Sequence, residues 1–321
     1  MSLVNKLTPI NLLEEKRKFF TDENYNPQFV YEEKPAAQIL YKHGYPQTKY
    51  LNLAQTILEK AYYQRNENEL NELKGTLVSQ QKVTQKTIDF LDIYQLKNRF
   101  KIIWSNSFVA RTTITADTIK FKLPADFRQQ DLLGMLYHEI GTHALRRINY
   151  EQQPWYKNKK KYGFANYLKT EEGLAGLHSL FPLNFQYAYY SALSYISVAF
   201  AQQHSFVELW NFLKKYVDHP EKRWAKTLRK KRGLEDTSQP GGFTKDLVYF
   251  EGIVKVWKYL KQNDFDITNL YLGKIALEDI TKSLKMNPKF KPLLPSFFVV
   301  NKEKYASTIN QIGQKNMFNQ I

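Results

Sequence analysis

Apolar residues recur at helical spacing along much of this 321-residue chain. The clearest case is the stretch 51–64, where one helix face would carry Leu51, Ala54, Ile57, Leu58 and Ala61. The same spacing predicts further helices over residues 12–20, 80–96, 206–217 and 244–261. Pro220 is expected to end the helix at 206–217, and Thr244 to be the N-cap of the last one.

Two stretches follow the strand pattern instead. Residues 101–109 and 111–123 alternate β-branched or aromatic residues with polar ones, which predicts a strand followed by a hairpin that Pro124 closes. We therefore expect an α+β fold that is predominantly helical, with one small sheet. Residues 185–202 carry no charge over nearly the length of a membrane span, but their tyrosines and serines favour a buried helix.

The length of the chain allows one large domain or two small ones. We expect a single catalytic domain over residues 1–321. Within it we expect a helical N-terminal part at 1–98, the site-bearing segments at 99–262 and a C-terminal helical extension at 263–321.

Two nearby stretches contain residues suited to metal binding and catalysis. They are His138-Glu139-Ile140-Gly141-Thr142-His143 and Glu171-Glu172-Gly173-Leu174-Ala175. Two imidazoles and a carboxylate can bind tetrahedral zinc and leave a fourth position for water. Glu139, next to the first histidine, would lie near the metal as a general base. Histidines beside a carboxylate can also be satisfied polar core groups, but the apolar stripe before them places this motif on a helix.

The spacing of the histidines requires a distortion. In a regular helix, residues five apart differ by roughly 140° around the axis, so His138 and His143 could not bind one ion. A π-bulge would bring both rings to one face, and Gly141 would lower its cost. We predict an irregular turn between Glu139 and Thr142.

The third ligand is Glu171 or Glu172. Ala175, Gly176 and Ser179 are the helical neighbours of Glu172, and this strip of small residues would let the helix pack closely on the histidine helix. We therefore expect Glu172 to be the ligand and Glu171 to hydrogen-bond a ligand. His178 is the only rival ligand, but it lies on another helix face.

A metallopeptidase site also needs a donor for the oxyanion, and one that cleaves at a free C-terminus needs a cation for the terminal carboxylate. Lys245 and Arg232 are candidates for the carboxylate, with Arg111 as a further substrate-binding candidate. Tyr249 is the candidate oxyanion donor, although a tyrosine on such a face is also often a packed core residue.

Several motifs together resemble a known family. HEIGTH, QPW at 153–155, TEEGLAGLHS at 170–179, RW at 223–224 and KRGLEDTSQPGGFTKDLVYFEG at 231–252 are similar to the microtubule-associated tyrosine carboxypeptidases. The resemblance runs from about residue 26 to about residue 280, and bacterial relatives are named for a QEGLA motif.

The resemblance implies a zinc carboxypeptidase with a gluzincin-like domain that removes a C-terminal aromatic residue from a polypeptide. In the animal enzymes this residue is the last tyrosine of α-tubulin. His138 and His143 match the zinc histidines and Glu139 the catalytic glutamate, and the acid shared with the QEGLA form is Glu172. In zinc peptidases a strand beside the active-site helix pairs with the extended substrate, and by analogy we expect this here.

Charge and composition limit the partners. The chain has 47 Lys and Arg against 31 Asp and Glu, a net charge of +16, which favours acidic peptide tails. Its basic runs at 157–161 and 223–232 are solvated faces or binding patches. The absence of cysteine and of a secretory signal at the N-terminus indicates a cytoplasmic protein without a membrane segment. The resemblance implies an association with microtubules.

Nucleotide chemistry has no support, since no glycine-rich phosphate loop precedes a helix. The rival interpretation is a basic regulator that binds nucleic acid and uses zinc only for structure. An open fourth ligand position and the presence of Glu139 count against it.

Overall fold

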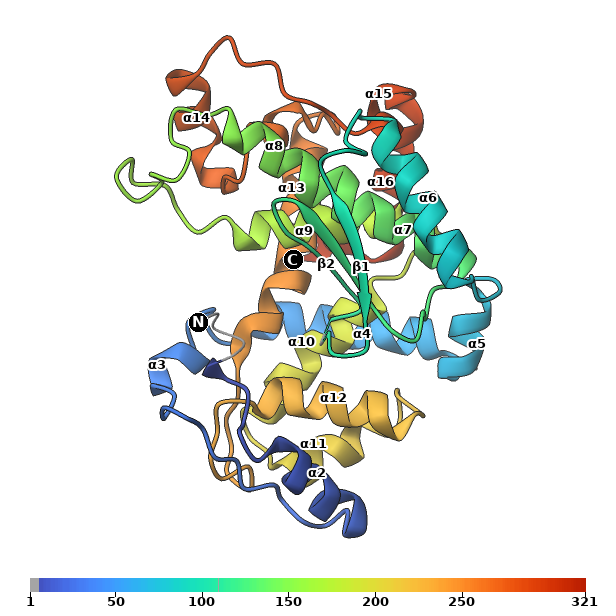
Figure 1. Ribbon diagram of the computed structural model, residues 1–321, viewed down its shortest axis with the longest axis vertical. Helices are drawn as coiled ribbons and strands as arrows, with labels where there is room; N and C mark the ends of the chain where they lie inside the picture. The colour runs from blue at the N-terminus through green and yellow to red at the C-terminus, as the bar shows by residue number, and fades with distance from the viewer. Residues whose placement is uncertain (1–5, 109) are drawn as a thin grey trace. The chain divides into compact units, whose positions relative to one another are not determined.

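The structure is a computed structural model that describes residues 6–108 and 110–321 (Figure 1). It is mostly helical and contains one three-stranded sheet, so the predicted α+β class is confirmed. The predicted strand end at Val109 lies outside the described residues. The chain forms two compact units. The first contains the described residues up to Asn68, Tyr189–Phe250 and Ile321, and the second contains Glu69–Ala188 and Glu251–Gln320. The expectation of one catalytic domain stays a prediction.

The first unit is helical. Its elements are α2 (Leu12–Thr21), α3 (Ala37–Leu40), α4 (Thr48–Tyr62), α10 (Tyr189–Ala201), α11 (Phe206–Leu213), α12 (Pro220–Lys231), η2 (Thr244–Asp246) and the first turn of α13 (Leu247–Gln262). The short helix α5 (Glu67–Glu72) crosses into the second unit. Helix α4 packs on α10, and a cluster of buried aromatic side chains, including Phe19, Phe206 and Trp210, joins α2 to α11. The predicted helices at 12–20 and 51–64 are confirmed.

Three expectations about where helices begin and end in this unit were wrong. Helix α11 ends at Leu213, and Pro220 begins α12 instead of ending the helix before it. Proline suits a first helical position because its missing N–H has no partner there in any case. Thr244 lies inside η2, where Phe243 is at the N-cap position, so Thr244 does not cap the last helix; its hydroxyl donates to the carbonyl of Leu40 at 2.9 Å.

The uncharged stretch at 185–202 is helical only over α10, and most of that helix is buried. A helix of this length is shorter than the roughly 20 residues that a bilayer requires. Across the part of the chain that the structure describes, every helix is too short or too polar to cross a membrane.

The second unit combines helices with the sheet. Its elements are α6 (Gln80–Asp92), β1 (Lys101–Ser105), β2 (Thr112–Ile114), β3 (Thr118–Lys122), α7 (Gln129–His138), η1 (Glu139–Ala144), α8 (Leu145–Glu151), α9 (Leu168–Leu180), most of α13, η3 (Thr268–Tyr271), η4 (Leu277–Asp279), α14 (Ile280–Met286), α15 (Ser296–Val299), α16 (Lys302–Lys315) and η5 (Phe318–Gln320). Helix α7 packs on α9, and η1 contacts α9 as well.

The sheet has the order β1-β3-β2, with β1 parallel and β2 antiparallel to β3. The predicted hairpin is therefore confirmed, and β2 is the edge strand beside η1. The backbone of Arg111 bonds Lys122 and that of Thr115 bonds Thr118. Because antiparallel pairs alternate, the N–H and C=O of Thr112 face away from β3. Within the described chain, this outer edge has no strand partner.

Candidate active site

The two candidate ligand histidines border one irregular helical turn. Helix α7 ends at His138, the π-helical turn η1 follows, and α8 continues the same direction from Leu145. The predicted irregularity between Glu139 and Thr142 is confirmed. The turn absorbs one extra residue, and the ring centroids of His138 and His143 lie 4.8 Å apart.

Side chains from elsewhere stabilise this turn. The Thr142 hydroxyl donates to the carbonyl of Tyr137 at 2.9 Å, and the Tyr271 hydroxyl donates to that of Gly141 at 2.6 Å. The prediction that Gly141 lowers the cost of this turn stays a prediction, and packing gives a second reason for the glycine. A Cβ at this position would lie 2.7 Å from Cε1 of Phe297, so packing requires the glycine.

Three ligand atoms converge at this turn. The Nε2 atoms of His138 and His143 are 3.2 Å apart, and Oε2 of Glu172 lies 3.8 Å from Nε2 of His143. All three ligand atoms lie within 4.8 Å of one another. Two nitrogens bound to tetrahedral zinc at about 2.0–2.1 Å would be separated by about 3.3 Å. The donor set therefore fits Zn²⁺ with one position left open.

Helix α9 supplies the carboxylates and packs closely on both sides. A Cβ at Gly134 of α7 would lie 2.5 Å from the carbonyl oxygen of Ser179, and the His138 ring hydrogen-bonds to the backbone of Ala175. Ala175 and Ser179, two of the three small residues predicted to pack on the histidine helix, therefore face α7. The prediction was wrong for Gly176, where a Cβ would lie 2.7 Å from Ile253 of α13.

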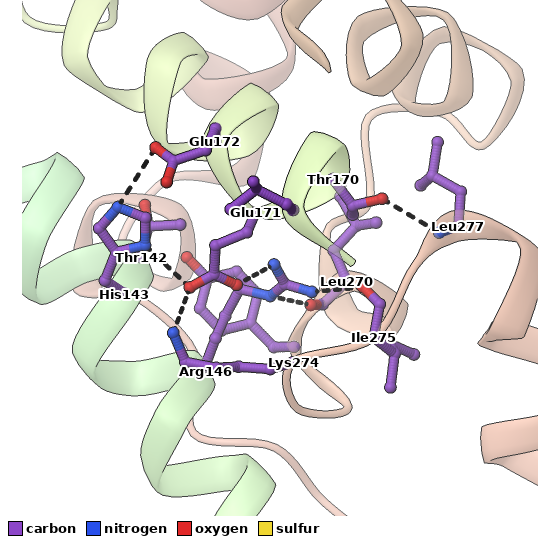
Figure 2. Close-up of polar contacts among 12 residues, drawn as sticks. Thr142, His143, Arg146, Thr170, Glu171, Glu172, Leu270, Lys274, Ile275 and Leu277 are labelled. Carbon is purple, nitrogen blue, oxygen red and sulfur yellow. Dashed lines mark hydrogen bonds and ion pairs between the residues drawn. The ribbon is translucent and has the colours of Figure 1, made fainter. Parts of the chain in front are cut away.

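Glu171 lies beside the candidate ligands and orients one of them (Figure 2). Its Oε1 accepts from Nδ1 of His143 at 2.8 Å, which leaves Nε2 of His143 facing His138 and Glu172. Burial acts to lower the pKa of His143, but the hydrogen bond to Glu171 and the charges of Glu172 and Glu139 raise it above its ordinary value.

The protonation of the other two site residues suits their candidate roles. Burial lowers the pKa of His138 to about 3, with the charge of His143 acting in the same direction, so His138 is a neutral imidazole that can bind a metal. Burial raises the pKa of Glu139, and Glu172 adds to this. Arg111 lowers it in part. A carboxylate with a raised pKa is a stronger proton acceptor.

The rival ligand His178 is fully engaged elsewhere. Its Nδ1 lies 2.7 Å from the Thr142 hydroxyl, and its Nε2 lies 2.8 Å from the Tyr305 hydroxyl. Because Thr142 donates its one hydrogen to Tyr137, it accepts from Nδ1–H, and Nε2 accepts from Tyr305. Both ring nitrogens are used, so His178 stabilises the turn rather than binding a metal.

The candidate substrate-binding residues divide between the two units. Arg111 belongs to the second unit, immediately before β2, and its charge lowers the pKa of both His138 and Glu139, which places it near the site. Tyr249, Lys245 and Arg232 belong to the first unit. Their roles as oxyanion donor and carboxylate-binding cations stay predictions.

In the first unit, Asp246 has cationic partners that the sequence did not indicate. Asp246 of η2 accepts from Arg229 at 2.7–2.9 Å and also from Lys230. Arg229 also lies 3.4 Å from the Tyr249 hydroxyl, to which it donates. Burial acts to raise the pKa of Asp246, but these two cations hold it well below its ordinary value.

The basic run at 223–232 is neither a solvated face nor a continuous patch, because Arg223, Lys230 and Lys231 are buried. The Lys231 ammonium is enclosed by backbone carbonyls. It donates to those of Ala201, His204, Gln239 and Gly241. These lysines therefore serve the interior of the first unit.

In the second unit, the sequence interpretation missed Arg146 and Lys274. Arg146 donates to Oε2 of Glu171 at 2.5 Å, and Lys274 donates to Oε1 at 2.6 Å (Figure 2). The position of Arg146, three residues after His143 and thus on the same helix face, could have indicated it. No local pattern marks Lys274.

Comparison with known proteins finds a matching family and several relatives. Residues 35–292 match the family model described as microtubule-associated tyrosine carboxypeptidase. Microtubule-associated tyrosine carboxypeptidase 1 of Mus musculus is 30% identical over 97% of this chain, and that of Homo sapiens is 32% identical over 85%. A second mouse relative, MATCAP2, is 30% identical over 98% of the chain.

The chain spans 68% of the first mouse relative, 62% of MATCAP2 and 60% of the human relative. The family model covers most of the chain, including every candidate ligand and Glu139. This chain therefore belongs to the family of microtubule-associated tyrosine carboxypeptidases.

Proposed function

We propose that this protein is a zinc-dependent carboxypeptidase of the HExxxH type that removes a C-terminal residue, tyrosine by preference, from a polypeptide. The observation that carries the proposal is the convergence of His138, His143 and Glu172 beside Glu139. An acidic tail such as that of α-tubulin is the proposed substrate, because the relatives are named tyrosine carboxypeptidases and this chain has a net charge of +16.

His138, His143 and Glu172 would hold the ion. Zn²⁺, when bound, supplies Lewis-acid activation of the attacking water and of the scissile carbonyl. A third ligand contributed as a glutamate by a second helix is the arrangement of a gluzincin-like domain, which we propose for the second unit.

Glu139 is the proposed general base. Its buried carboxylate accepts the proton of the attacking water and delivers it to the leaving amine. Its raised pKa suits the first step, since a stronger base takes the proton more readily.

The outer edge of β2 is the proposed docking edge for the substrate backbone. It lies beside η1, and the N–H and C=O of Thr112 face outward, as an added antiparallel strand requires. Arg111, at the start of this strand, offers a positive charge for the terminal carboxylate. Tyr249, Lys245 and Arg232 remain further candidates for the oxyanion and the carboxylate. We expect the protein to act in the cytoplasm, on or near microtubules.

The proposal is tested with an acidic peptide that ends in tyrosine, with mass spectrometry as the readout. The wild-type protein should release tyrosine, and an amidated peptide should resist. Glu139→Gln should lower the rate by about 10²–10⁴-fold while zinc content and thermal unfolding stay unchanged. Glu151→Gln is the matched control, because Glu151 pairs with Arg99 and lies outside the site.

A wild-type rate in Glu139→Gln would contradict the proposal, as would a zinc-loaded wild-type protein that releases no residue. Nucleic-acid binding without hydrolysis would favour the rival regulator. Higher ionic strength should slow the processing of an acidic peptide, because salt screens the attraction.

A further inference from the structure

A loop between α13 and α14 is bonded to η1 and α9, which carry the candidate ligands His143 and Glu172. Residues 270–277 contact η1 through the Tyr271 hydroxyl, which donates to the Gly141 carbonyl at 2.6 Å. They contact α9 through the backbone N–H of Leu277, which donates to the Thr170 hydroxyl at 3.1 Å. We refer to residues 270–277 as the bracing loop. Figure 2 shows several of its contacts.

Arg146 fixes the middle of this loop. Its Nε donates to the carbonyl of Leu270 at 2.8 Å and its Nη2 to that of Ile275 at 2.9 Å. Its Nη1 donates to Oε2 of Glu171. The guanidinium therefore binds the backbone on both sides of Lys274 and one oxygen of Glu171 at the same time (Figure 2).

Lys274 completes the arrangement from within the loop. Its Nζ lies 2.6 Å from Oε1 of Glu171, the same oxygen that accepts from Nδ1 of His143 at 2.8 Å. The Lys274 side chain is only 16% exposed, and its own backbone carbonyl accepts from Lys159. The ammonium is therefore held at this oxygen rather than sampling solvent.

The two cations act on opposite oxygens of one carboxylate. Arg146 attracts Oε2, and Lys274 attracts Oε1 toward the side where His143 donates. Without Lys274, Arg146 would be the only cation on Glu171. The carboxylate could then rotate toward the fork of its guanidinium, because a bidentate Arg–carboxylate pair is the stronger geometry. The hydrogen bond that orients the His143 ring would weaken.

We propose that Lys274 is a positioning residue for the metal site: through Oε1 of Glu171 it fixes the His143 ring with Nε2 toward His138 and Glu172. The inference rests on the proposed function in that the bound group is Zn²⁺. Hydrogen-bond partners of ligating histidines typically change metal affinity by 10–100-fold, and Lys274 acts on such a partner.

The test measures Zn²⁺ affinity by competition with a chromogenic chelator, so it does not depend on hydrolysis. Lys274→Met should weaken Zn²⁺ binding by about 10-fold or more. Lys274→Arg, which keeps a charged donor, should restore most of the affinity. The matched control is Lys169→Met, since Lys169 of α9 also pairs with a buried acid, Glu251, at 2.5 Å. The Lys169→Met substitution should leave Zn²⁺ affinity unchanged.

Wild-type affinity in Lys274→Met would overturn the proposal, and so would an equal loss in Lys169→Met. If Lys274→Met does not fold, the same titration on Lys274→Gln decides, because glutamine keeps a donor without the charge. A wild-type protein that binds no Zn²⁺ would instead overturn the proposed function. A wild-type protein that binds Zn²⁺ without hydrolysing peptides would leave the role of Lys274 intact.

Discussion

Each unit of this protein buries one carboxylate against an arginine and a lysine, yet the two centres are built differently. Asp246 in the first unit is held by Arg229 and Lys230, adjacent residues near the end of α12. Glu171 in the second unit is held by Arg146 of α8 and Lys274 of the bracing loop, and it also accepts from an imidazole.

This difference shows what a buried charge can be used for. The Asp246 centre joins η2 to a single helix, so we expect it to determine the stability of its unit. The Glu171 centre joins three distant segments and contacts a candidate metal ligand, so we expect it to determine metal affinity as well. Burial and ion pairing are common to both centres. The additional hydrogen bond from His143 to Glu171 is what distinguishes the second centre.

The largest expected effect is on the first centre. Asp246→Asn leaves the buried Lys230 without an anion and the partly exposed Arg229 without its partner, and it should lower the free energy of unfolding by about 3–5 kcal/mol. Denaturant unfolding followed by circular dichroism measures this. Lys34→Met removes an exposed ion pair with Glu235 and should cost less than about 1 kcal/mol.

Unchanged stability in Asp246→Asn would show that this centre is dispensable. Weaker Zn²⁺ binding in the same variant would break the comparison, since the first centre would then also serve the metal site.

The second centre should respond mainly through the metal. Glu171→Gln replaces one acceptor oxygen by a donor, so either Arg146 loses its acceptor or His143 and Lys274 lose the oxygen that they share, and Zn²⁺ affinity should fall by about 10–100-fold. Chelator competition measures this, with Asp246→Asn as the matched control. Zn²⁺ binding at wild-type strength would mean that His143 needs no carboxylate to orient it.

The smallest expected effect is a pH dependence. Because the folded pKa of Asp246 lies below its unfolded value of about 3.9, its contribution is present above that pH and is lost as the pH falls. Below about pH 4, the wild-type protein should lose up to about 1.4 kcal/mol more per pH unit than Asp246→Asn. Unfolding curves between pH 5 and pH 2 measure the difference. If the free energies of unfolding of the two proteins fall in parallel with pH, the ionisation of Asp246 does not contribute to the stability of this unit.

Features that depend on local periodicity could be predicted from the sequence. The stripe at 51–64 and the alternation at 111–123 gave a helix and a hairpin, because each pattern repeats with the period of its element. The irregular turn between Glu139 and Thr142 followed from the angle between two histidines that must share one face.

Features that depend on partners distant in the sequence could not be predicted from it. The α12 segment has few apolar residues, and its buried lysines need backbone carbonyls and an acid that only the folded unit provides. Lys274 lies far along the chain from Glu171 and follows no repeating pattern. Pro220 was misread because proline both ends helices and begins them, and only the neighbouring structure decides which.

The π-helical turn also has a consequence for the ancestry of the site. A turn of this kind equals one residue inserted into an otherwise regular helix, and α7 and α8 continue on either side of it. Deleting one residue between the histidines would therefore restore a four-residue spacing with both rings still on one side. A single codon then separates this motif from the shorter zinc helix, and Thr142 and Tyr271 are the contacts that such a deletion would give up.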